Sequence, residues 1–453
     1  MTRQLLPCLL ICLAPSTAIA QVQIESVTTT PPNLVVPNYN SVPVGPFAGL
    51  EGTAFVARVS DPSAAWFNPA GLAREISAQI SGSAGVYSHL VVSPMELENS
   101  GGSFQQLPSF IGFTFKVREG FTAGFAFLTN TAWIQETDGQ LISSAPTGQE
   151  RFAFSSDSKF TRRVAAMSVG HHPERSPWRY GGGFAFSLTN LRLLQSGSHR
   201  VANPEDLRTL LVTSRVSSWA LQLRGQGGVQ YDTDRWRFGA ALRTPGLNLF
   251  RGAGLSNDAT LSVPPDSLGA STFDTDASFE NHLPWEVQAG AAFVASRFEI
   301  EVDVLGYSSI SPYTMIATDQ PTLVYVDAGA GVPPTVLSRP FEGLTSASDG
   351  TINVGVGGRF KVLKDRNLRI HAGVFSNRSP VGAADVVFSR VDLTSWTVGA
   401  SGSAGKFSFS LGVNTQTGTT DDVTFRHLLD DDEIRTRATI RSTGVLYQLA
   451  FKF

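Results

Sequence analysis

Apolar and polar residues alternate with a period of two along most of the chain beyond residue 75. The segment 110–117, FIGFTFKV, shows the pattern: Ile111, Phe113 and Phe115 share one face, and the residues between them are small or polar. Successive side chains of a strand point to opposite faces, so this period predicts strands with two unlike faces. Similar runs occur at 219–224, 236–243, 285–293, 298–304, 352–360, 368–374, 396–400, 407–413 and 445–453.

The links between these runs alternate in length. Short links lie at 118–120, 171–177, 231–234, 295–296, 363–365 and 405–406. The long links are rich in Ser, Thr, Asp, Gly and Pro, and lie at 89–107, 135–157, 194–210, 244–282, 308–350, 378–392 and 415–434. Tight turns on one side and long loops on the other are typical of outer-membrane barrels, whereas a soluble sandwich, the alternative, need not alternate. The pattern therefore predicts an all-β fold, a transmembrane up-and-down antiparallel β-barrel of about 14 strands.

Residues 1–20 have a different character. A basic start, an apolar run at 5–13 and the sequence Ala18-Ile19-Ala20 predict a cleaved signal peptide. Cys8 and Cys12 both lie within it, so the mature chain uses neither disulfides nor thiolate chemistry. We expect export to the bacterial outer membrane.

Composition agrees with this class of protein. The chain has 43 Gly and 30 Phe, and only 16% of its residues are charged. A net charge of −3 gives no electrostatic basis for binding nucleic acid. After the signal peptide, no apolar run approaches the roughly 20 residues that a membrane-spanning helix needs.

Residues 21–75 precede the first expected strand, which we place near Ile76, and the barrel is expected to occupy 76–453. The first part of this segment, at 29–46, is Pro-rich and expected to be extended. The second part is small and compact, and ends in SDPSAAWFNPAGLA (60–73). Asp61, which precedes Pro62 and Ser63, can cap a short helix that Asn68-Pro69 ends, because the residue before proline avoids helical angles.

The sequence AGLEGTAFVARVSDPSAAWFNPAGLA (48–73) resembles the N-terminal hatch of the FadL/TodX family of outer-membrane transporters. The stretches LPWEVQAGAAF (283–293) and LRIHAGVFSNRSPVG (368–382) are also similar to family segments. The resemblance implies a fourteen-stranded barrel whose lumen the hatch plugs, and passive uptake of long-chain fatty acids or hydrocarbons. It implies gating by hatch movement, with lateral exit through the wall. The residues that this assigns to the hatch are Asp61, Ser63, Asn68, Pro69, Ala70 and Gly71.

Several charged residues fall on the polar faces of the expected strands, and therefore face the lumen. They are Arg224, Arg237, Glu299, Glu301, Asp303, Arg359 and Arg369. One interpretation is a polar path or a site for a carboxylate. The other is a network of paired charges that holds the hatch, as expected where polar faces are shut away from water.

We expect a monomeric transporter of hydrophobic small molecules, in contact with outer-membrane lipids and lipopolysaccharide. A general porin, an adhesin-like barrel and an outer-membrane lipid hydrolase are the alternatives. The seven histidines form no recognisable catalytic constellation, and no spacing suggests a metal site or a cofactor. The terminal Phe453 resembles the C-terminal aromatic residue by which bacterial barrels are recognised, so we expect the barrel-assembly machinery as a partner.

Overall fold

The computed structural model describes residues 35–45, 47–74, 78–92, 103–145, 148–203, 206–263, 266–327, 333–363, 367–426 and 433–453. The predicted signal peptide (1–20), residues 29–34 and 46 of the Pro-rich segment, and the predicted strand start at Ile76 lie outside these residues.

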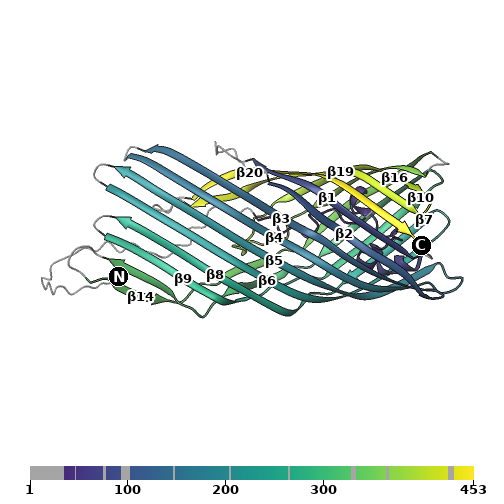
Figure 1. Cartoon of the computed structure of the whole chain (residues 1–453), viewed down its shortest axis with the longest axis horizontal. Helices are drawn as coiled ribbons and strands as arrows, with labels where there is room; N and C mark the ends of the chain where they lie inside the picture. Colours follow the sequence, from purple (N-terminus) through teal and green to yellow (C-terminus); the bar gives the residue numbers. More distant parts are fainter. Residues whose placement is uncertain are drawn as a thin grey trace, which may run out of the picture.

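The chain forms a long antiparallel barrel (Figure 1). Each strand of the wall pairs with the strands before and after it in the chain, some of them in pieces, and β1 closes the barrel by pairing with β20, from Gln79 opposite Lys452 to Val92 opposite Thr439. The strands are β1 (Gln79–Val92), β2 (Ser103–Arg118), β3 (Phe121–Ala145), β4 (Gly148–His171), β5 (Trp178–Asn203), β6 (Asp206–Asp232), β7 (Trp236–Arg243), β8 (Leu247–Val263), β9 (Asp266–Phe279), β10 (Glu286–Val294), β11 (Phe298–Tyr307), β12 (Ile310–Ala317), β13 (Thr322–Asp327), β14 (Thr335–Arg339), β15 (Leu344–Ser348), β16 (Thr351–Leu363), β17 (Leu368–Asn377), β18 (Asp392–Ala404), β19 (Phe407–Arg426) and β20 (Glu433–Lys452).

Some of these strands are pieces of one longer strand. β7 and β8 both pair with β6, β7 and β11 flank β10, and β12 and β13 both pair with β9. The pieces β7–β8, β9–β10, β11–β13 and β14–β16 are therefore four interrupted strands of the wall. The barrel has 14 strands, as the sequence predicts.

Burial in this barrel is the reverse of that in a soluble domain. Phe113, Val302 and Leu449 point outward and are exposed, whereas Gln222 and Glu301 point inward and are fully buried. An apolar outer face combined with a polar inner face suits lipid outside and a closed lumen inside. Closure through β1 and β20 also removes the two free edges that an open sheet would present to hydrocarbon.

Most of the long links that the sequence predicts are instead strand. β5 and β6 have 26 and 27 residues and are joined at 204–205, so the expected loop 194–210 is wrong. The same correction applies to most of 135–157, 244–282, 308–350 and 415–434. Crossing the membrane takes only about 9–11 residues. Beyond it the outward face no longer has to be apolar, so the alternation of apolar and polar residues that marks a strand weakens while the pairing persists.

Candidate functional site

The hatch comprises residues 47–74 and lies inside the barrel, near the end that carries the C-terminus (Figure 1). It contains three short helices, η1 (Ala48–Leu50), α1 (Ala64–Phe67) and η2 (Pro69–Arg74). Its apolar residues pack against inward-facing residues of β2 to β5, among them Phe110 and Val164. Neither α1 nor the other helices of the described chain have the length and hydrophobicity of a membrane span.

The predicted hatch turn is held by its own side chains. The Asp61 carboxylate accepts a hydrogen bond from the backbone N–H of Ser63 (2.8 Å), the N-cap residue of α1, instead of bonding to the helix itself. Asn68 ends the helix with an extended backbone, as predicted. Its amide nitrogen donates to the backbone oxygens of Val56 and Val229 (both 3.0 Å), and its amide oxygen accepts from the N–H of Ala70 (3.2 Å).

Glycines on the wall allow this turn to approach the strands closely. A Cβ on Gly181 of β5 would lie 2.2 Å from the carbonyl carbon of Pro69, and one on Gly228 of β6 would lie 2.1 Å from the Asn68 amide oxygen. Gly71 sits equally tightly, since its Cβ would meet the Val59 backbone oxygen at 2.3 Å. Backbone therefore packs on backbone here, which leaves no room for a solute while the hatch stays in place.

A cluster of buried charges fastens the hatch to β11 on the opposite wall. Arg58 of the hatch binds Glu301 of β11 (2.6 Å) and Glu51 of the hatch (2.5 Å), and all three side chains have no exposed area. Asp303, the next inward residue on β11, accepts from the backbone N–H groups of Phe55 (2.9 Å) and Val56 (3.0 Å). Buried charges need such partners, because an unpaired one is strongly destabilising.

The cluster continues toward β16, β17 and β18. Arg359 of β16 binds Glu299 (2.7 Å), which also lies 3.5 Å from Arg58. His371 of β17 bridges Glu51 and Ser401 of β18, with 2.7 Å on each side. We call Glu51, Arg58, Glu299, Glu301, Asp303, Arg359 and His371 the charge cluster.

Glu51 is ionised in this setting. Burial raises the pKa of its carboxyl, but the Arg58 guanidinium and the His371 contact more than offset this and lower the pKa to about 2. The carboxylate therefore carries a negative charge inside the hatch at neutral pH.

Four of the seven lumen residues predicted from the sequence belong to the charge cluster, namely Glu299, Glu301, Asp303 and Arg359. Arg237 lies near the short-turn end of β7, opposite Asp232, and within the described residues it makes no ion pair. Arg224 and Arg369 lie elsewhere, as described below.

Sequence reasoning missed Glu51, Arg58 and His371. The sequence did contain a signal for the first two: they are charged residues in a segment of otherwise mostly small or apolar residues, PFAGLEGTAFVAR (46–58). Ser401, His371 and Glu51 are linked by hydrogen bonds in the order of the Ser-His-carboxylate triad of a serine hydrolase. However, Ser401 lies between two paired strands, so the nearby N–H groups belong to the ladder and offer no oxyanion hole.

Four adjacent strands of the wall are interrupted at one level. Arg243, Glu286, Tyr307 and Thr351 are register neighbours across β7, β10, β11 and β16. Just beyond them the regular ladder is interrupted at 244–246, 280–285, 308–309 and 349–350, where single backbone bonds remain, such as Ser308 N–H to the Trp285 oxygen (3.0 Å); β17 ends close by at Asn377. We call these interruptions together the wall break.

Arg224 of β6 closes the inner side of the wall break. Its guanidinium donates to the backbone oxygens of Thr244 (2.7 Å) and Pro284 (2.9 Å), which the missing ladder would otherwise leave free. The hatch reaches the same place, because Arg243 binds Glu286, donates to the Trp66 backbone oxygen and stacks on the Trp66 ring at 3.8 Å.

On the side of the hatch away from the short turns, the lumen is lined by apolar side chains. Trp133, Phe160 and Leu191 are register neighbours on β3, β4 and β5, and form part of one buried cluster. The other wall residues of this apolar belt are Phe154, Leu193, Val216, Ala220, Ala253, Leu255, Ala277, Phe279, Met315, Ile316, Leu393, Ala438 and Ile440. Polar residues are the usual lining of a barrel lumen, so the belt suits an apolar occupant.

The chain itself fills the belt. Val35 and Val36 pack there together with Val387 and Val391, which belong to the link between β17 and β18. Residues 35–45, which we call the strap, run from the belt to the hatch. Tyr39 of the strap packs on Tyr307 with ring centroids 4.4 Å apart.

Phe453 follows the end of β20, and its backbone N–H donates to the Ala78 oxygen (2.9 Å) beside β1. Its side chain is exposed. Its role in assembly stays a prediction. In the described residues, no group of three or more His, Cys, Asp and Glu side chains could hold a metal ion.

No protein-family model and no curated protein matches this sequence. Solved structures do match the fold. A FadL homologue of Pseudomonas aeruginosa is 14% identical, with a TM-score of 0.56 over 93% of this chain and all of its own. The toluene transporter TbuX of Ralstonia pickettii is 14% identical (TM-score 0.54, 91% of this chain and 99% of its own). The toluene transporter TodX of Pseudomonas putida is 13% identical (TM-score 0.54, 93% and 100%). The fold resemblance that the sequence predicts is therefore confirmed.

Proposed function

We propose that this protein conducts small hydrophobic molecules, such as hydrocarbons or long-chain fatty acids, passively across the outer membrane. The observation that carries the proposal is the apolar belt, an apolar lining inside a barrel whose inner face is otherwise polar. The toluene transport for which TbuX and TodX are named is chemistry of the same kind.

The solute enters from the end of the barrel opposite the short turns. It replaces the strap and the β17–β18 link within the belt. Both segments contribute valines to the belt. An apolar solute that takes their place keeps the belt dry, so the exchange conserves most of the buried apolar area.

Passage beyond the belt requires the hatch to move. It is held by the charge cluster on one side and by Trp66 against Arg243 on the other. The second contact joins the hatch to the edge of the wall break, so a shift of α1 acts directly on that edge.

The exit that we propose is lateral, through the wall break into the membrane. On the outside of the barrel, the break opens on a hollow of about 440 Å³ lined by Trp285, Val287, Tyr307 and Ile352. A hydrocarbon that leaves here passes from an apolar lumen to lipid without crossing water.

The test is uptake of radiolabelled toluene by cells that lack hydrocarbon channels of their own. Gly306 lines the outer hollow, so Gly306→Trp fills the exit and is expected to reduce uptake at least fivefold. Val302→Trp, outward on the same strand and away from the hollow, is the matched control and leaves uptake unchanged. Equal uptake by the two variants would refute the lateral exit.

A general porin is the second candidate, and conductance separates the two. A plugged transporter in a planar bilayer shows no large open pore. A stable, nonselective conductance in the unaltered protein would refute the proposed function.

A further inference from the structure

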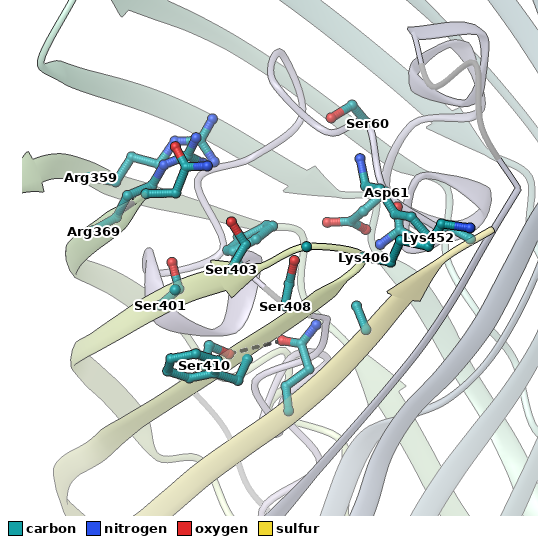
Figure 2. Close-up of a pocket in the computed structure, with 18 of the residues that line it drawn as sticks. Ser60, Asp61, Arg359, Arg369, Ser401, Ser403, Lys406, Ser408, Ser410 and Lys452 are labelled. Atoms are coloured by element: carbon teal, nitrogen blue, oxygen red, sulfur yellow. Dashed lines mark hydrogen bonds between the residues drawn. The ribbon is translucent and has the colours of Figure 1, made fainter. Parts of the chain in front are cut away.

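A second cavity lies on the other side of the hatch, toward the short turns. It has a volume of about 440 Å³ and lies between Phe47, Phe55, Ser60 and Asp61 at the hatch and the strands β1 and β16 to β20 (Figure 2). Neither the apolar belt nor the wall break contributes a lining residue. We call this cavity the basic chamber.

Its lining is polar and carries mainly positive charge. Four basic side chains face it, Arg359, Arg369, Lys406 and Lys452, against one carboxylate, Asp61. In Figure 2 the two arginines lie together on one side, and the two lysines lie on the other side close to Asp61. Hydroxyl groups of five serines complete much of the wall between them.

The cations of the chamber are only partly paired with carboxylates. Arg359 shares Glu299 with Arg58, and no carboxylate of the described residues lies within ion-pair distance of Arg369 or Lys406. Arg359 and Arg369 stand on the paired strands β16 and β17, two residues apart in register. Like charges held this close repel one another, and an anion between them relieves the repulsion.

We propose that the basic chamber is a binding site for an oxyanion, a phosphate or a carboxylate. Guanidinium groups offer planar pairs of N–H donors that match such oxygens, and serine hydroxyls add further donors. The oxyanion is either a free periplasmic ion or the head group of an anionic amphiphile. A hydrocarbon has no partner for these groups, so the site goes beyond hydrocarbon transport and does not depend on it; a fatty acid is the one solute that the two proposals share.

The site also adjoins the fastening of the hatch. Arg359 and Ser401 line the chamber and contact Glu299 and His371 of the charge cluster. A bound oxyanion therefore lies next to the groups that hold the hatch closed.

The experiment is ³¹P NMR and calorimetric titration of the full-length protein in a nonionic detergent, with inorganic phosphate as the probe. We expect saturable binding of phosphate that decanoate displaces and decane does not. The double substitution Arg369→Gln with Lys406→Gln should weaken phosphate binding at least tenfold, because it removes the two cations without a described partner.

Lys116→Gln is the matched control, since this cation of β2 does not line the chamber. It should leave the affinity unchanged, and heat-modifiable gel mobility confirms that each variant is a folded barrel. Decanoate that binds at least tenfold tighter than phosphate identifies an amphiphile head group as the occupant, and equal affinities identify a free ion. The proposal is overturned if neither anion binds saturably, or if the double variant and the control bind phosphate with equal affinity. Loss of toluene uptake bears only on the proposed transport.

Discussion

Glu51→Gln should loosen the hatch while the barrel stays folded. The substitution keeps the shape of the side chain but removes the negative charge that Arg58 binds at 2.5 Å and His371 at 2.7 Å. Arg58 then has Glu301 and the more distant Glu299 as its remaining ion-pair partners, in a site without exposed area.

The magnitude follows from the pKa of Glu51. Its carboxyl titrates at about 2 in the closed hatch and at 4.5 when free, so the closed state favours the ionised form. Since one pKa unit corresponds to about 1.4 kcal/mol, the difference amounts to about 3 kcal/mol, in the range measured when buried ion pairs are broken. The open hatch should therefore become about 100-fold more populated.

Cysteine labelling measures this population, because the predicted mature chain has no cysteine of its own. Ala64→Cys places a thiol on the fully buried face of α1, where a maleimide reacts only when the hatch opens. We expect the Glu51→Gln background to speed labelling by about 100-fold, and Glu119→Gln, an exposed carboxylate in a short turn, to leave it unchanged. Labelling within threefold of the parent would show that the charge cluster does not hold the hatch.

Lowering the pH should protonate Glu51 and thereby loosen the hatch. The folded pKa of Glu51 lies below its unfolded value, so its contribution is complete above pH 4.5 and is lost as the pH falls toward about 2. The labelling rate of Ala64→Cys, divided by that of an exposed cysteine at the same pH to remove the loss of thiolate, should rise across this window in the parent and change much less in Glu51→Gln. Parallel pH profiles would contradict the assignment.

Three further substitutions test other parts of the site. Gly181→Ala pushes a methyl group into the hatch turn and should lower the free energy of unfolding by about 1–3 kcal/mol, whereas Gly197→Ala, with nothing within 4 Å, should not; thermal unfolding in detergent compares them. Arg224→Gln leaves carbonyls of the wall break unsatisfied and should cost about 1–3 kcal/mol, so an unchanged melting temperature would refute its closing role. Phe279→Ala enlarges the apolar belt and should raise uptake of larger hydrocarbons relative to toluene; an unchanged ratio would exclude the belt from the path.

The sequence predicts the barrel well because strand alternation is a local property. In a segment such as 298–304, the alternation itself shows that one face is apolar and the other polar, and no distant part of the chain is needed to see this. The hatch helix could also be placed, since Asn68-Pro69 fixes its end by a local steric rule. Strand ends were predicted poorly because pairing continues beyond the lipid, where the outward face no longer has to be apolar.

The site depends on contacts that no local pattern contains. Arg58 meets Glu301 across 243 residues of chain, and Glu51 meets His371 across 320. The wall break arises because interruptions at four separate places fall on one level, which follows only from the register of the strands between them. Sequence alone therefore predicted a barrel with an N-terminal segment to plug it. The tertiary structure decided which charges hold the plug, where the wall is interrupted and which cavity gathers positive charge, because closing a barrel brings together residues that the chain keeps far apart.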